Sequence, residues 1–520
     1  MKNTLKWIFL LIPLVYSCFD DKGNYNYTEL NKITVENITY SNNINYGDPL
    51  DITPKLKFAL DSTNVELKYE WIINEIVVDS TPELHIESFK YYTGSRRCYF
   101  RVQDVATGMK YVEQFQVSVS GTYQFGWLIL SEKDQKSSLT YVREQKKEDK
   151  DGNIEIIYDY ETDVYKKVNG QDLGSGPIQL LEHWTTGGRD VGEILVLQKS
   201  GSVDLEGNTM VKAIDTEKEF LNEKYPDNFV PKLALYTNTC GYLVSEDGKT
   251  YSRNNADPAA FHSGRFMRNP MMFEGKTLNC THTIMTSTEA SKGVLLFDKQ
   301  PGEKGRYIAM MDYYYYAEKS GNPTAISLKN YPEGFSDLNA MDRELIYSSF
   351  QNDDNWDDTS IFSILFDKEE NKYYIQNFLY KVEYWTGNIK VTPNFEEVFA
   401  GSPNITSQSV FALARKTPFI YFSGGANNNE LYFCNLEKGT TLCEKAKITY
   451  TSPIASIAVS TLGNRIGVAL ENGEFYLLDA DALRTDKTLY HIPIDANIGK
   501  VKHCIFKLGV TNNFIFGDED

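Results

Sequence analysis

From residue 121 onward the sequence repeats one unit, in which an apolar strand meets a turn of Gly, Asn or Asp and a second strand returns. The clearest copy runs from Ile466-Gly467-Val468-Ala469 through Asn472-Gly473 to Phe475-Tyr476-Leu477-Leu478. The copies begin about 56 residues apart on average. A propeller blade takes about 40–50 residues, so this spacing fits a propeller in which some blades carry insertions. The repeat therefore predicts a seven-bladed β-propeller over residues 121–520, with eight blades or an irregular two-layer β fold as alternatives. The seven copies begin at residues 127, 194, 242, 294, 345, 419 and 466.

A closed propeller needs a strand that joins the two ends of the ring, and the end of the chain contains a candidate. Apolar residues recur between Cys504 and Phe516, in Ile505-Phe506 and Phe514-Ile515-Phe516. We expect this segment to supply the closing strand. Residues 456–460 are similar to the inner strand of a WD-like blade, although the repeats lack the Trp-Asp pair of that class.

The residues before the repeats form a smaller unit of short alternating strands. Leu67, Tyr69 and Trp71 share one face of an extended segment, and Phe115 and Val117 alternate in the last strand before the repeats. About 90 residues with this pattern predict an Ig-like sandwich over residues 31–120. An aromatic side chain midway along such a strand has to be buried, so Trp71 is expected in the core.

The composition supports an all-β chain and excludes one class of partner. Aromatic residues reach 13%, which favours strands over helices. The chain is acidic, with 71 Asp and Glu against 53 Lys and Arg and a pI near 5.0. Nucleic-acid binding needs clustered basic side chains, so we expect no nucleic-acid partner.

Residues 1–17 have the pattern of a secretory signal peptide, with positive charges at Lys2 and Lys6 before a short apolar stretch. A membrane-spanning helix needs about 20 apolar residues, and this stretch is shorter. The signal ends at Ser17-Cys18 in a sequence similar to a bacterial lipobox, where the cysteine is acylated and becomes the first residue of the mature protein. We therefore expect a lipid on Cys18, with residues 18–30 as anchor and linker.

The segment after the cysteine carries a more specific resemblance. Asp20 and Asp21 resemble the export signal of surface lipoproteins of Bacteroidetes, and Gly23-Asn24-Tyr25-Asn26-Tyr27 completes the segment. Together with Tyr69-x-Trp71 and Val102-x-Asp104, this start resembles the PKD-like lipoproteins of Bacteroidetes. The resemblance implies a PKD-like N-terminal domain and an outer-membrane location at the cell surface. It also implies a partner, because the genes of such proteins accompany SusC/SusD-type importers.

Motifs of catalysis and cofactor binding are rare. The sequence has no HExxH helix, no Gly-x-Ser-x-Gly turn and no phosphate-binding Gly-rich loop, so we expect no cofactor. His262 and His282 lack a companion ligand at metal spacing, and lysines crowd Asp149 and Asp151, so no metal site is expected. The acidic run at residues 352–358 is interpreted as an exposed insertion. A glycosidase needs only two carboxylates, and the many acidic residues leave that alternative open.

Aromatic residues in turn-rich segments are the candidates for ligand binding. A Trp ring has an apolar face and an N–H donor at its edge, so it can stack on a sugar or pack on a peptide. The alternative for each residue is to cover its own blade. The candidates are Trp184, Tyr313, Tyr314, Tyr315, Tyr316, Trp356 and Trp385.

Two of the cysteines are candidates for a disulfide. Cys434 and Cys443 are symmetric about Lys438-Gly439, so a hairpin that turns there places them opposite each other, near disulfide distance. The remaining cysteines resemble ordinary core residues, which favours two reduced thiols here and leaves the disulfide as the alternative. These residues are Cys98, Cys240, Cys280 and Cys504.

Taken together, these patterns predict a surface-exposed lipoprotein that is not an enzyme. The resemblance to the PKD-like lipoproteins implies that it serves a SusC/SusD-like uptake system. Its ligands would be an extracellular glycan or peptide, and outer-membrane lipid would hold the acylated cysteine. Two alternatives stay open. One is a propeller hydrolase or lyase that acts on extracellular glycan or peptide, and the other is a structural scaffold within the importer complex.

Overall fold

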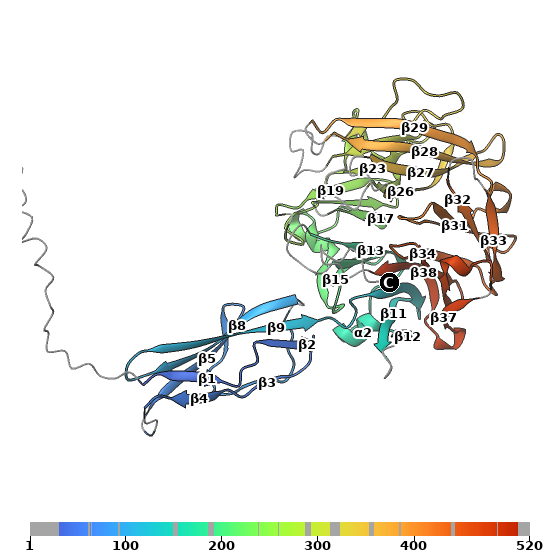
Figure 1. Ribbon diagram of the computed structural model, residues 1–520. Helices are drawn as coiled ribbons and strands as arrows, with labels where there is room; N and C mark the ends of the chain where they lie inside the picture. The colour runs from blue at the N-terminus through green and yellow to red at the C-terminus, as the bar shows by residue number, and fades with distance from the viewer. Residues whose placement is uncertain are drawn as a thin grey trace, which may run out of the picture. The chain divides into compact units, whose positions relative to one another are not determined.

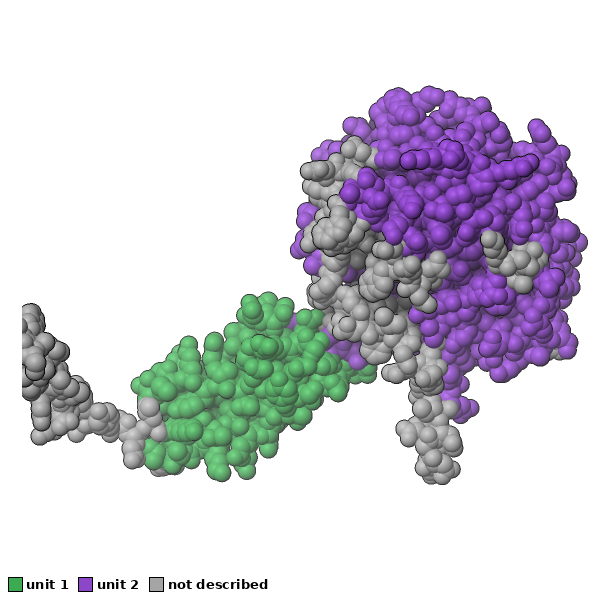
Figure 2. All heavy atoms as spheres, turned by 45° about the horizontal axis from the view of Figure 1, so that its top comes forward, with its two compact units in different colours: residues 1–89, 95–118 green, residues 90–94, 119–520 purple. Residues whose placement is uncertain are grey.

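The structure is a computed structural model of the 520-residue chain, and nearly all of its regular elements are strands. The chain separates into two compact units, residues 1–89 with 95–118 and residues 90–94 with 119–520 (Figure 2). The sequence predicts this boundary between residues 120 and 121. The structure describes residues 31–507 except 61–62, 64, 92–93, 149–153, 186–191, 238, 258, 287–292, 312–322, 353–357, 384–385, 438–441 and 486.

The first unit has one large sheet and two short ribbons. The large sheet has five strands in the order β2-β9-β8-β5-β6, and the ribbons pair β1 with β4 and β3 with β7. Figure 1 shows the ribbons along one side of the large sheet. The strands are β1 (Ile33–Glu36), β2 (Ser41–Asn45), β3 (Leu50–Ile52), β4 (Lys55–Phe58), β5 (Leu67–Ile73), β6 (Ile76–Asp79), β7 (Leu84–Ile86), β8 (Gly94–Asp104) and β9 (Lys110–Ser120).

Trp71 is the centre of this unit, as the alternation in its strand predicts. Its side chain is completely buried, and its ring centroid lies 4.2 Å from that of Phe100 on the paired strand. The indole Nε1–H donates to the Thr81 carbonyl oxygen at 2.9 Å, so its polar edge is satisfied inside the core. Phe115 meets the ring edge-on at 5.9 Å. The expected Ig-like, PKD-like sandwich is confirmed for this part of the chain.

The second unit is a β-propeller, and its described residues contain seven sheets of three or four antiparallel strands and one small ribbon. The sheets are, in order, β38 (Lys500–Lys507) with β10 (Gly126–Lys133), β11 (Lys136–Glu148) and β12 (Ile154–Glu161); β13 (Pro177–His183), β14 (Glu193–Gln198), β15 (Val203–Glu206) and β16 (Lys212–Asp215); β17 (Pro231–Tyr236), β18 (Cys240–Ser245) and β19 (Thr250–Asn254); β22 (Cys280–Met285), β23 (Val294–Asp298), β24 (Arg306–Met310) and β25 (Thr324–Ala325); β26 (Glu344–Asn352), β27 (Asp358–Asp367), β28 (Lys372–Val382) and β29 (Ile389–Val398); β30 (Phe411–Leu413), β31 (Phe419–Gly424), β32 (Glu430–Asn435) and β33 (Cys443–Thr449); and β34 (Ile454–Val459), β35 (Arg465–Leu470), β36 (Phe475–Asp479) and β37 (Thr488–Ile492). The ribbon pairs β20 (Met272–Phe273) with β21 (Lys276–Thr277).

The described helices of this unit are all short and lie in the connections between strands. They are α2 (Val164–Asn169), η1 (Thr216–Glu219), η2 (Leu221–Glu223), η4 (Ser402–Asn404), η5 (Ala480–Ala482) and η6 (Ile494–Ala496).

The first strands of the seven sheets form a closed ring. β38 contacts β13, the contacts continue through β17, β22, β26, β30 and β34, and β34 contacts β38 again. The ring closes in the first sheet, where β38 from the end of the chain pairs antiparallel with β10 from its beginning. In Figure 1 the red C-terminal strand accordingly lies among the teal strands of the first sheet. The closing strand ends at Lys507, whereas the sequence placed it between Cys504 and Phe516; residues 508–520 lie outside the described residues.

The repeats found in the sequence are mainly the second strands of the sheets. The copies that begin at residues 127, 194, 242, 294, 419 and 466 fall in β10, β14, β18, β23, β31 and β35. These strands contain continuous apolar runs because both of their faces are covered, and β14, β18 and β35 are buried at every position. The copy at residue 345 is different, since it falls in β26, the first strand of its sheet. That shift by one strand explains part of the uneven spacing of the repeats.

Cys434 and Cys443 are paired in register on β32 and β33 and form a disulfide. The register that the sequence indicated is therefore present, but the preference for two reduced thiols was wrong. The reason is local, since the two strands bring the Cα atoms of this pair to within 4.1 Å of each other. The other cysteines beyond residue 30 are buried free thiols.

Candidate functional site

The first strands of the propeller enclose a central cavity of about 280 Å³. Its lining residues come from β13, β22, β26, β30, β34 and β38, and from residues that directly follow three of these strands. Ligand sites in β-barrels and propellers are found where loops and inner strands converge on such a space. The cavity is therefore the candidate functional site.

Several polar and aromatic side chains meet at one end of this cavity. As first strands of consecutive sheets, β13, β30 and β34 run in the same direction along the channel. Trp184, Arg415 and Ser460 each stand just after the C-terminal end of one of these strands. These residues are far apart in the sequence and converge only because the strands end at the same rim.

The charges at this end of the channel are centred on Glu182. Its Oε1 lies 3.8 Å from Nζ of Lys507, and that ammonium also donates to the Gln124 carbonyl oxygen at 3.0 Å. Burial lowers the pKa of Lys507, although the Glu182 carboxylate acts in the opposite direction. Burial likewise lowers the pKa of Arg415, again opposed by Glu182. Glu206 also acts on Lys507, so that ammonium lies near two carboxylates. Arg415 is the one Lys or Arg among the described residues that line the cavity, and it favours a ligand that brings a negative or strongly polar group.

Trp184 lies at this end and is half-buried. The indole packs against the backbone of Gly192, where an added Cβ would lie 2.8 Å from the Trp184 Nε1. Only glycine leaves room for the ring at that point, so the β13–β14 hairpin fixes the position of Trp184. Nε1 has no hydrogen-bond partner among the residues that the structure describes. Because Nε1 is enclosed, the part of the indole that is open to a ligand is its apolar face.

His503 on β38 is a further member of the lining and stays neutral. Burial lowers its pKa to about 4. Its Nδ1 accepts a hydrogen bond from the Leu180 N–H at 3.2 Å, so the neutral ring carries its proton on Nε2. This bond also ties the closing strand to the second sheet.

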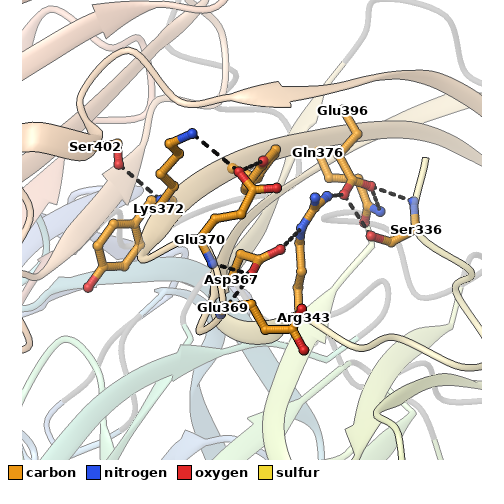
Figure 3. A network of polar contacts seen from close by, with 11 residues as sticks. Ser336, Arg343, Asp367, Glu369, Glu370, Lys372, Gln376, Glu396 and Ser402 are labelled. Atoms are coloured by element: carbon orange, nitrogen blue, oxygen red, sulfur yellow. Dashed lines mark hydrogen bonds and ion pairs between the residues drawn. The ribbon is translucent and has the colours of Figure 1, made fainter. Parts of the chain in front are cut away.

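A second cavity, of about 410 Å³, lies beside the loop that precedes β26, and its polar groups are satisfied by one another. Glu396, whose side chain is completely buried, accepts hydrogen bonds from the Ser336 N–H (2.8 Å) and hydroxyl (2.6 Å), from Gln376 Nε2 (2.7 Å) and from Arg343 (Figure 3). Arg343 also binds Asp367 at 3.1 Å and covers the Tyr374 ring at 3.5 Å. This network fastens the loop to β28 and β29, and we assign it a structural role.

Most of the other sequence candidates cannot be placed. Trp184 lines the channel, but the remaining aromatic candidates and the lipidation site lie outside the described residues. These are Cys18, Tyr313, Tyr314, Tyr315, Tyr316, Trp356 and Trp385.

Sequence analysis missed the charged part of the site. Glu182, Arg415, Lys507 and His503 have no shared motif, since they come from three segments that are far apart in the sequence: β13, the residues after β30, and β38. The one signal that could have found them is position, because each lies in the first strand of a sheet or just after it.

Comparison with known proteins adds one relationship. Residues 18–177 match the PKD-like family. The PKD-like match begins at Cys18, spans the first unit and continues through β10, β11, β12 and α2. No protein with a curated description matches the chain. Among the described residues, no helix has the length and apolar character required to cross a bilayer.

Three solved structures that are similar to this chain have low sequence identity with it. A quinonprotein alcohol dehydrogenase-like protein from Bacteroides thetaiotaomicron has a TM-score of 0.41 and 12% identity, over 90% of this chain and 97% of that one. Sqt1 from Saccharomyces cerevisiae has a TM-score of 0.39 and 12% identity, over 62% and 76% of the two chains. A chain of a mitotic checkpoint complex has a TM-score of 0.37 and 8% identity, over 62% and 82%.

Proposed function

We propose that this protein is a surface-exposed, lipid-anchored binding component of a SusC/SusD-like outer-membrane uptake system, with a glycan or peptide as its ligand. The observation that carries the binding role is the end of the channel, where Trp184 lies with Arg415 and Glu182 on the wall of one cavity. An indole face stacks on sugar rings or peptide side chains, and a guanidinium binds carboxylates in a fixed geometry. This combination suits an acidic sugar or a peptide carboxylate best.

Binding without turnover fits the channel better than hydrolysis does. Glycosidases use two carboxylates, whereas Glu182 is the one acidic residue among the described residues that line this cavity. Its carboxylate already faces Lys507 at 3.8 Å and the charge of Arg415. We therefore propose that the propeller belongs to an accessory protein that binds its ligand without converting it. The alternative is an enzyme that acts on extracellular glycan or peptide, and the binding assay tests it.

The location and the partner rest on the N-terminal residues. The PKD-like match begins at Cys18, the residue at which the lipobox-like sequence places the lipid. Asp20 and Asp21 come after Phe19, close behind that cysteine, and resemble the export signal of surface lipoproteins of Bacteroidetes. An acidic body of this kind is repelled by anionic lipid, so the acyl chains would hold it at the membrane while the body stays in solvent.

Replacing Trp184 with Ala should weaken ligand binding about thirtyfold, since losing an aromatic anchor at the centre of a site costs about 2 kcal/mol. Glycan and peptide arrays identify a ligand for the purified wild-type protein, and isothermal titration then measures its affinity. The melting temperature should change little, because Trp184 is only half-buried.

The matched control is Tyr160→Ala, which removes an exposed aromatic from β12, the outermost strand of the first sheet. It should leave the affinity unchanged. Equal affinities for the wild type and the Trp184 variant would place the binding face elsewhere. Release of reducing ends or new amines from the array ligands would identify the protein as an enzyme.

Lipidation is tested separately. Growth with a palmitate analogue should label the wild-type protein, and Cys18→Ala should abolish the label because no thiol remains at the lipobox position. Replacing Asp20 and Asp21 with Ala should keep the label and reduce cleavage by protease added to intact cells. Equal labelling of wild type and Cys18→Ala would exclude the anchor.

A further inference from the structure

A compact cluster of buried polar side chains lies between the second and third sheets of the propeller, outside the channel. His183, Glu193 and Asp204 come from the neighbouring strands β13, β14 and β15, and His262 comes from the loop that follows β19. Their side chains are 3%, 4%, 0% and 16% exposed, in that order. Four groups that can each bind a metal ion are thus enclosed in one place.

The ligand atoms of these four residues converge. His183 Nε2 lies 2.9 Å from an Asp204 oxygen, and His262 Nε2 lies 2.6 Å from a Glu193 oxygen. The ligand atoms of His183, Glu193 and Asp204 all lie within 4.8 Å of one another, and so do those of Asp204, Glu219 and His262. The two groups share Asp204, and the contact between His262 and Glu193 joins them a second time. Two imidazoles and two carboxylates are thus the side chains available for a four-coordinate metal site.

The neighbours of His262 hold its ring in the orientation that a metal needs. Its Nδ1 lies 2.7 Å from Glu219, whose carboxylate is completely buried and is also bound by Arg253. When Nδ1–H donates to Glu219, the neutral ring turns the lone pair of Nε2 toward Glu193 and Asp204. A carboxylate behind a histidine ligand is the usual outer partner in metal sites.

The charges and hydrogen bonds of the cluster are incomplete without a cation. Three carboxylates face one guanidinium, so two negative charges are in excess when both imidazoles are neutral. One oxygen each of Asp204 and Glu219, both wholly buried, accepts no hydrogen bond from the residues that the structure describes. The His183 ring is enclosed by Tyr236, at 4.8 Å, and Phe261, at 5.4 Å. Two unbalanced charges in such apolar surroundings are costly, and a divalent ion would neutralise both.

We propose that His183, Glu193, Asp204 and His262 bind one Zn²⁺ ion. Two imidazoles with two carboxylates and no thiolate suit zinc better than calcium or magnesium, which prefer oxygen ligands alone. All four positions are filled by protein and the site is enclosed, so the ion stabilises structure and does not activate water. The ion would join the loop after β19 to the second sheet. That loop follows the last strand of the third sheet, the one propeller sheet with three strands instead of four among the described residues.

The first test measures bound metal in the full-length protein. After equilibration with excess Zn²⁺ and gel filtration, mass spectrometry of the elements should find about one zinc per chain. His183→Ala and Asp204→Asn should each lose that zinc, and Glu219→Gln should keep it with an affinity 10–100-fold weaker. The matched control is His85→Ala, since His85 is exposed in the N-terminal unit and outside the cluster; it should retain the full amount.

The second test needs no variant and so does not depend on whether the substituted proteins fold. Co²⁺ in place of Zn²⁺ should give the intense visible bands of a four-coordinate site, without the charge-transfer band of a thiolate ligand. Chelation should lower the melting temperature of the wild type, and added Zn²⁺ should restore it. A wild type that holds no zinc, or variants that hold as much as the wild type, would overturn the proposal and leave a network held by protonated imidazoles.

Discussion

A chain that ends at Gly499 should lose the cooperative unfolding transition of the propeller altogether. This truncation removes β38, the innermost strand of the first sheet, which pairs with β10. It also opens the ring, because β38 contacts β13 on one side and β34 on the other. It uncovers the buried Trp127, whose ring centroid lies 4.9 Å from that of Phe506, and it removes the Lys507 partner of Glu182. Differential scanning calorimetry and near-ultraviolet circular dichroism measure the result.

The matched control for the truncation is a chain that ends at Lys507, which keeps the whole of β38. It should unfold cooperatively, and limited proteolysis should leave its propeller intact, whereas the shorter chain should be degraded through all its sheets. A cooperative transition within a few degrees of the wild type in the shorter chain would mean that the ring does not depend on its closing strand.

Replacing Arg343 with Met should lower the free energy of unfolding by about 3–5 kcal/mol, because it leaves the Glu396 carboxylate buried without its cation. Glu396 is 0% exposed and Arg343 is 18% exposed, so solvent can replace little of the lost interaction. Methionine keeps most of the apolar stem that packs on the Tyr374 ring. Urea denaturation followed by tryptophan fluorescence gives the difference.

Two further variants isolate the role of the buried charge. Adding Glu396→Gln to Arg343→Met should recover part of the lost stability, since an amide still accepts hydrogen bonds and carries no charge. Lys304→Met breaks an ion pair with Asp342 in which the side chains are 56% and 77% exposed, and it should cost less than about 1 kcal/mol. A loss in Arg343→Met no larger than that in Lys304→Met would contradict this account of the network.

The strands that the sequence reveals are those buried on both faces. β14 and β35 contain the unbroken apolar runs 194–197 and 466–470, so their positions are evident from hydrophobicity alone. The inner strands face the channel on one side and are short or mixed in character. β30 has only the three residues Phe411–Leu413, and β13 mixes Gln179 and Glu182 with leucines. The fold class was therefore predictable, whereas the identity of each inner strand was not.

The candidate site was predictable only where one residue carries the signal by itself. Trp184 stands out because a tryptophan in a turn-rich segment is uncommon. Arg415 and Glu182 gain their meaning only from the convergence of β30 and β13 at one end of the channel. His262 likewise has no ligand near it in the sequence, and its neighbours in the cluster come from three strands of another sheet. Contacts between residues so far apart in the sequence form only when the ring closes, so no local sequence pattern predicts them.

Ring closure by the last strand also determines the order in which the chain can fold. Synthesis delivers a polypeptide from its N-terminus, so β10 emerges early and waits for its partner β38 until almost the whole chain has followed. The N-terminal sandwich has all its strands before residue 121 and can fold at once. The propeller stays incomplete until the chain has been made as far as Lys507. The same topology that makes the propeller cooperative therefore delays its folding until synthesis is almost finished.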